Sequence, residues 1–248
     1  RILSNDEAAK WSKDLSIMNA DSKASFLGKL ASNLPDRAQF GTLMNQIAPD
    51  KPTSRIAAGM MQFSSMKPTA EMILKGEQIL NTTKNKAGED QKPSLIPLPK
   101  DNLLKENILK VIGNAYVGQG VSAAKDFEDN FQAIKAHYTA NAVEKNLLNA
   151  DETQFDKDQL QQSINAVTGG VVKLSFWGNN YAYVPYGMDP EDFKKQAPLK
   201  IREALDNAGM QTARWESFGL AEIENGRYQL INSGRIVPNA YVDFNGSR

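Results

Sequence analysis

The spacing of apolar residues changes once along the chain, near Gly169 and Gly170. Before that point apolar residues recur every three or four positions, which is typical of amphipathic helices. The clearest such run is Phe127, Phe131, Ile134, Tyr138 and Ala142. After that point apolar and polar residues alternate over short stretches, which is typical of half-buried strands. The sequence therefore predicts an α+β fold that is mainly α, with a helical N-terminal two-thirds and a small mixed region after it.

The mixed region is expected to contain two β-hairpins and one helix. The first hairpin pairs residues 171–176 with residues 181–184 across a short turn, and the second turns at Asn225 and Gly226. A last strand is expected at residues 236–237 or 241–244. Between the hairpins, Asp189 and Pro190 begin a helix in which Pro198 predicts a break or a kink.

The helical part is interrupted at residues 81–100, where a polar stretch is followed by Pro93, Pro97 and Pro99. We therefore expect three regions: a helical region over residues 1–92, a helical region with a long helix over residues 93–168, and the small α+β region over residues 169–248. Capping residues and prolines mark where the first helices begin. These starts are Ser4, Asp21, Pro35, Thr53 or Ser54, and Pro68.

The composition excludes several kinds of chemistry. The 248 residues include no cysteine, so disulfides, thiolate metal sites and cysteine nucleophiles are impossible. His137 is the only histidine, which excludes sites that need two imidazoles, and we expect it at the flank of its helix stripe, hydrogen-bonded or solvated. Lys and Arg number 29 and so do Asp and Glu, which gives no specific nucleic-acid signature. We expect no metal site and no cofactor.

Two carboxyl groups are enough to cleave a glycan without a metal ion, so a pair of acidic residues is the kind of catalytic centre that this composition allows. Two fragments resemble motifs of soluble lytic transglycosylases: the residues 59–62, Gly-Met-Met-Gln, and the pair Glu216 and Ser217. Their order along the chain is the reverse of the order in those enzymes. If such a site exists, Glu216 is the candidate general acid, and we expect Trp215 and Phe218 to raise its pKa.

Aromatic residues gather around the first predicted hairpin and are the candidate binding residues. They are Trp177, Tyr181, Tyr183 and Tyr186. Such a set can stack sugars or bases. Alternating aromatics on a hairpin also pack a strand against its own core, so both interpretations stay open.

Several stretches, taken in chain order, resemble the very large internal virion (ejection) proteins of tailed bacteriophages and prophages. The most specific are Ala166-Val167-Thr168-Gly169-Gly170-Val171 and Val184-Pro185-Tyr186-Gly187-Met188-Asp189. The others are residues 72–78, the proline-rich run 93–99, residues 113–116, the helix around Tyr138, and the ending formed by residues 226–228 and 241–244. Members of this group often carry a lytic transglycosylase domain in another part of the polypeptide. The resemblance covers most of residues 70–244.

The resemblance implies a non-catalytic structural or interaction region that acts in genome delivery. Its implied partners are other virion proteins or other domains of a longer parent chain. Its implied location is the bacterial cytoplasm before assembly and then the virion, and no signal peptide or membrane-spanning run is visible in the sequence. Two alternatives remain open: a peptidoglycan-degrading protein related to lytic transglycosylases, and a free-standing binding module. The sequence favours a protein that is not an enzyme.

Overall fold

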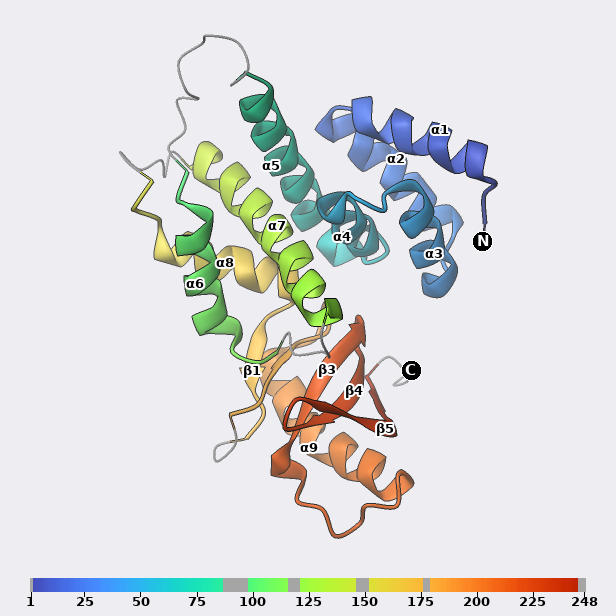
Figure 1. Ribbon diagram of the computed structural model, residues 1–248, viewed down its shortest axis with the longest axis vertical. Coiled ribbons are helices and arrows are strands. Elements are labelled where there is room, and N and C mark those ends of the chain that lie inside the picture. The colour runs from blue at the N-terminus through green and yellow to red at the C-terminus, as the bar shows by residue number, and fades with distance from the viewer. Residues whose placement is uncertain (1, 87–97, 116–120, 146–151, 176–178, 245–248) are drawn as a thin grey trace. The chain divides into compact units, whose positions relative to one another are not determined.

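The computed structural model describes residues 2–86, 98–115, 121–145, 152–175 and 179–244. The helices are α1 (Asn5–Ile17), α2 (Ala20–Asn33), α3 (Arg37–Ile47), α4 (Pro52–Met61), α5 (Lys67–Lys86), α6 (Asp101–Ile112), α7 (Val121–Glu144), α8 (Lys157–Thr168) and α9 (Pro190–Asn207). Short 3-10 turns lie at η1 (Ser64–Met66) and η2 (Trp215–Ser217). The strands are β1 (Val171–Lys173), β2 (Tyr181–Tyr183), β3 (Phe218–Glu224), β4 (Arg227–Asn232) and β5 (Arg235–Asp243). The fold is α+β and mainly α, as predicted, with the strands in the C-terminal part (Figure 1).

The chain divides into two compact units, each built from two separate stretches. Unit 1 comprises residues 1–104 and 129–163, and unit 2 comprises residues 105–128 and 164–248. Both units combine stretches that the sequence analysis assigned to different regions. The long helix α7 contributes its first part to unit 2 and its second part to unit 1.

Unit 1 is a set of helices, and the first turns of α1, α2 and α3 are fixed by local caps. Ser4 and Glu7 form a complete capping box at α1, in which the Glu7 carboxylate accepts from the Ser4 N–H at 2.8 Å. Asn19 caps α2 and Asp36 caps α3, each accepting a backbone N–H. Helices α2, α4 and α5 pack against one another and bury apolar side chains such as Leu27, Met60 and Ile73.

Two contacts tie the second part of α7 to the other helices of unit 1. Gly76 in α5 lies so close to α7 that a Cβ at this position would be 1.7 Å from the carbonyl oxygen of Ala136. Arg55 in α4 forms an ion pair with Asp129 in α7 at 2.6 Å. The small residue at position 76 therefore sets how closely α5 can approach α7.

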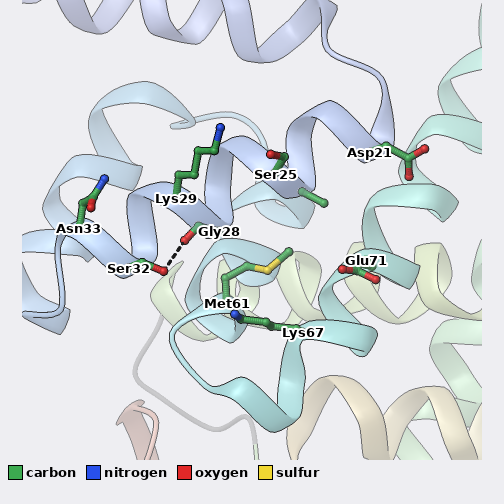
Figure 2. A pocket seen from close by; sticks show the side chains of 10 residues that line it. Asp21, Ser25, Gly28, Lys29, Ser32, Asn33, Met61, Lys67 and Glu71 are labelled. Carbon is green, nitrogen blue, oxygen red and sulfur yellow. Dashed lines mark hydrogen bonds between the residues drawn. The ribbon is translucent and has the colours of Figure 1, made fainter.

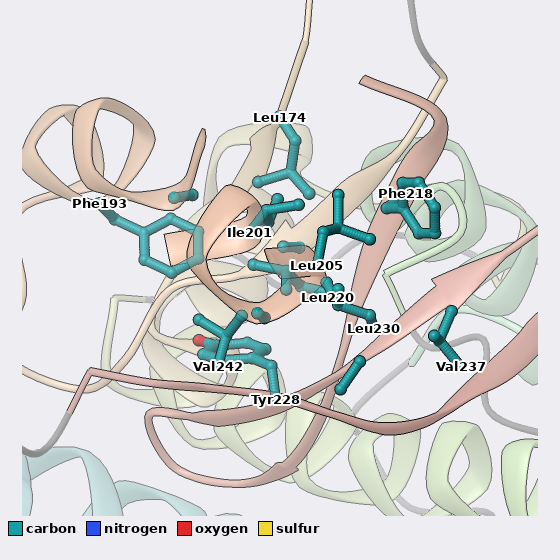
Figure 3. Close-up of a cluster of buried hydrophobic side chains, with 14 of the residues drawn as sticks. Leu174, Phe193, Ile201, Leu205, Phe218, Leu220, Tyr228, Leu230, Val237 and Val242 are labelled. Carbon is teal, nitrogen blue, oxygen red and sulfur yellow. The ribbon is translucent and has the colours of Figure 1, made fainter. Parts of the chain in front are cut away.

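Unit 2 holds a two-stranded sheet, β1–β2, and a three-stranded antiparallel sheet in the order β3–β4–β5. Helix α9 packs against the larger sheet, and Figure 3 shows its Ile201 and Leu205 beside Leu220 and Leu230 of the strands. Phe193 of the same helix packs on Tyr228, with ring centroids 5.7 Å apart. Asp189 caps this helix and Pro190 occupies its first turn, as predicted. The helix continues through Pro198 without interruption, so the predicted break is absent.

Both predicted hairpins are present. In the first, Val171 pairs with Tyr183 and Lys173 with Tyr181. In the second, β3 and β4 are joined at Asn225 and Gly226, and Gly226 has a φ of 79°, which favours glycine in such a turn. The last strand, β5, covers both of the short stretches that the sequence offered as alternatives.

Candidate functional site

The candidate binding tyrosines act mainly as links within unit 2. The hydroxyl of Tyr186 donates to the carbonyl oxygen of Val167 at 2.8 Å, and burial raises the pKa of this hydroxyl above its usual value. Tyr183 is 6% exposed, and its carbonyl oxygen accepts from the Tyr228 hydroxyl at 2.6 Å. Tyr183 and Tyr186 are close enough for their charges to interact. These contacts favour the scaffold interpretation for both residues.

Tyr181 begins β2, two residues before Tyr183, and makes contacts of its own. Its ring packs on Gly113 at the end of α6, where an added Cβ would be 2.5 Å from a ring carbon. Its backbone N–H donates to the Asn114 side chain at 2.7 Å. Trp177, the fourth candidate, lies outside the described residues. The structure thus places Tyr183 near Tyr186, and gives Tyr181, two residues before Tyr183 in β2, its own contacts with Gly113 and Asn114.

The proposed general acid, Glu216, lies in the 3-10 turn η2 and is half-buried. Its neighbour Trp215 packs on the apolar cluster of unit 2, and Phe218 is 2% exposed. The other transglycosylase-like fragment, residues 59–62, ends α4 in unit 1. There Met60 and Met61 are buried and the Gln62 side chain donates to the Leu34 carbonyl at 3.2 Å. The two fragments belong to different units, and the methionines of the second have a packing role.

His137 is buried, in contrast to the flank position expected for it. It is 8% exposed, and its Nδ1 lies 2.9 Å from the hydroxyl of Ser163, which also accepts from Gln159 at 3.1 Å. Burial lowers the pKa of His137 to about 4, and the nearby charge of Lys145 lowers it further in the same direction. Ser163 is fully buried. The nearly buried His137 and the fully buried Ser163 thus form a structural network within unit 1.

Glu222 is the residue that the sequence analysis missed. It lies in β3 opposite Tyr228, and its Oε1 accepts from the Gly226 N–H at 3.3 Å. Burial raises the pKa of its carboxyl group to about 8, because a charge in apolar surroundings loses its hydration. The two-residue period of β3 was the available signal, since Phe218, Leu220 and Glu222 share one face. That face is the core face.

A shallow groove of about 540 Å³ lies between α2 and the α4–α5 connection of unit 1. Figure 2 shows the small residues Ser25, Gly28 and Ser32 along α2, with Met61 on the facing segment and the Ser32 hydroxyl donating to the Gly28 carbonyl at 3.0 Å. Nothing lies within 4 Å of a Cβ built on Gly28, so the short residues leave this space open. Charged side chains of both signs line the rim: Asp21, Lys29, Lys67 and Glu71. The groove has the mixed character of a contact surface.

The part of the chain that the structure describes shows neither a metal-binding cluster nor a membrane-spanning helix. It contains no group of three or more acidic or histidine side chains arranged to hold a metal ion. None of its helices combines the length and apolar character needed to cross a bilayer. Comparison of the chain with known protein families, curated proteins and solved structures gives no match.

Proposed function

We propose that this chain is a non-catalytic structural and interaction region of an internal virion protein of a tailed phage or prophage, acting in genome delivery. The observation that supports the proposal is spatial. Two of the stretches that carry the resemblance, residues 166–171 and 184–189 of unit 2, are separate in sequence, yet they contact one another directly. This is the pattern expected if they are the fold-determining parts of one shared domain.

The contacts join two of these stretches to each other and to the turn that precedes a third. The N–H of Val184 donates to the Gly170 carbonyl at 2.9 Å, which connects residues 184–189 to residues 166–171. The Tyr186 hydroxyl reaches Val167 in the same stretch. The Asn225 side chain accepts from the Tyr186 N–H at 2.7 Å, which adds the turn next to residues 226–228. Each contact holds backbone in place, which is a structural role.

The stretch at residues 72–78 has a comparable role in unit 1. Glu77 forms an ion pair with Lys23 at 2.5 Å, and the Gln78 side chain accepts from the Ala20 N–H at 2.6 Å. With Gly76 in contact with α7, three neighbouring residues of this stretch each fix a different contact. The partners proposed for the whole region are other virion proteins or other domains of a longer parent chain. The proposed location is the bacterial cytoplasm before assembly and the particle afterwards.

The first test is to induce the prophages of the source strain, purify the particles and search them for peptides of this chain by mass spectrometry. We expect the peptides in the particle, together with others from one longer polypeptide. Particles from a strain in which the gene is deleted provide the matched control. Peptides found in the lysate and absent from the particle would overturn the virion assignment.

A zymogram of purified protein on peptidoglycan separates the proposal from its catalytic alternative. We expect no clearing of the gel by the chain. Clearing that is lost in Glu216→Gln and retained in Glu224→Gln would instead establish the transglycosylase-related function. Glu224 is a suitable control because it lies on the exposed end of β3.

A further inference from the structure

The strand β3 presents a carboxyl group on the face that packs the core. Side chains on alternate positions of a strand share a face, so Glu222 follows Phe218 and Leu220 toward α9. Figure 3 shows Phe218, Leu220 and the facing Tyr228 in the apolar cluster. Phe218, Leu220 and Tyr228 are each no more than 2% exposed. Glu222 extends this buried row at the end nearest the turn.

The described groups that face Glu222 from neighbouring elements are tyrosines. Tyr228 faces it from β4, and Tyr186 faces it from the segment before α9, with Tyr183 of β2 next to Tyr186. Within the described residues, no lysine, arginine or histidine forms an ion pair with Glu222. The N–H of Gly226 is the polar partner of its carboxyl group. One weak hydrogen bond does not replace the hydration of a carboxylate.

The protonated form is therefore the form that the folded unit accommodates. Burial raises the pKa of Glu222 to about 8, although the Gly226 hydrogen bond acts in the opposite direction. Burial, and to a smaller extent the nearby Glu222 charge, raises the pKa of Tyr186 and of Tyr228, so both hydroxyls stay neutral while Glu222 titrates. The residue is half-buried, so protons can reach it from solvent.

We propose that Glu222 is a proton-operated latch that holds the β3–β4 turn against the segment at residues 184–189. The turn is connected to that segment through Asn225, which accepts from the Tyr186 N–H. While Glu222 is protonated, its side chain stays in the apolar row and the turn stays closed. When the proton leaves, the carboxylate must move toward water, and the turn that carries Asn225 moves with it. The inference stands independently of the proposed function.

The sign of the pH dependence follows from the direction of the pKa change. A carboxyl group that holds its proton more tightly when folded stabilises the fold at low pH, and this stabilisation is lost as the pH rises from about 4.5 through 8. Over that window folding takes up as much as one proton. The folding equilibrium constant of unit 2 should fall by up to about tenfold for each pH unit.

Urea unfolding between pH 5 and pH 9 tests the latch in a chain whose Trp11 and Trp177 are replaced by phenylalanine, so that the fluorescence of Trp215 is the signal of unit 2. We expect the loss of stability with rising pH in the wild type, little of it in Glu222→Gln, and the wild-type profile in Glu224→Gln. Glutamine has the shape of the protonated acid and no charge. A Glu222→Gln profile with the wild-type slope would overturn the latch.

A second measurement remains decisive if the glutamine variant does not fold. The side-chain carboxyl carbon of Glu222 in the wild-type chain can be titrated by NMR, and we expect a midpoint well above 6. A midpoint near 4 would contradict the proposal. Hydrogen exchange of the Tyr186 amide at pH 9 tests the movement of the turn. The latch requires exchange at least tenfold faster in the wild type than in Glu222→Gln. Equal rates in the two proteins would exclude the movement.

Discussion

At the scale of the residue, the sharpest constraint in unit 1 is Gly76. We expect Gly76→Ala to destabilise the protein by about 3 kcal/mol or more, because its Cβ would meet the backbone carbonyl of Ala136 and backbone cannot move aside like a flexible side chain. The matched control is Gly41→Ala in α3, where nothing lies within 4 Å of the added Cβ. The control should be more stable than the wild type by about 0.5–1 kcal/mol, as alanine is the better helix former. Chemical denaturation measures both, and equal effects would refute the close approach.

The same scale shows why the candidate site was only partly predictable. The scaffold alternative for Tyr183 and Tyr186 was available from the sequence, because alternating aromatics suit a packed strand. Their hydrogen bonds to Tyr228 and Val167 could not be predicted, because these partners are 45 and 19 residues away in the sequence. For His137, the sequence identified the apolar stripe of its own helix. It did not reveal that Ser163 of α8 packs on this histidine. A pattern within one helix does not reveal what packs on it.

At the scale of the element, helix α4 is stabilised by a carboxylate from another helix. Its N-cap, Lys51, makes no side-chain cap, and Glu77 of α5 accepts instead from the hydroxyls of Thr53 and Ser54 in the first turn. The Glu77 carboxylate also neutralises Lys23, whose side chain is 8% exposed. A cation this buried and left alone is costly.

We therefore expect Glu77→Gln to lower the free energy of unfolding by about 3 kcal/mol. The control is Glu144→Gln, which breaks the ion pair of α7 with Lys75 of α5, where both side chains are about half exposed. That change should cost less than about 1 kcal/mol, because water screens the pair. Thermal or chemical denaturation gives both values. Similar losses in the two variants would show that the burial of the Lys23 pair has no energetic weight.

The sequence located the elements well and their ends less well. Local signals predicted the box at Ser4 and the cap at Asp189 because all the interacting groups lie within one turn. Asp21 was expected to cap α2, but Asn19 does so, and Asp21 lies in the first turn. The cap of α4 could not be predicted from the local sequence, because Glu77 is 24 residues beyond Thr53. Pro198 is tolerated within α9, where Ala197 and Ile201 on either side are buried against the sheet.

At the scale of the whole molecule, the pKa values of Glu222 in unit 2 and His137 in unit 1 are both shifted by burial, and the two shifts act on stability in opposite directions. Glu222 in unit 2 favours the fold as the pH falls from about 8 to 4.5. His137 in unit 1 has a lowered pKa, so its contribution is present above its usual value of 6.5 and is lost as the pH falls toward 4. Such a lowering is worth at most about 3 kcal/mol. Neither effect could be foreseen from the composition, because both depend on burial.

Acidification should therefore separate the unfolding of the two units. The tryptophans Trp11 and Trp215 report on unit 1 and unit 2 respectively, once Trp177 is replaced by phenylalanine and each reporter is left as the single tryptophan. Between pH 7.5 and pH 4.5 we expect the urea midpoint seen by Trp215 to rise and that seen by Trp11 to fall. His137→Gln should flatten the Trp11 profile and leave the Trp215 profile unchanged. If both reporters instead give one midpoint at every pH, the two units unfold as a single cooperative structure, and the buried charges of one unit govern the stability of the other.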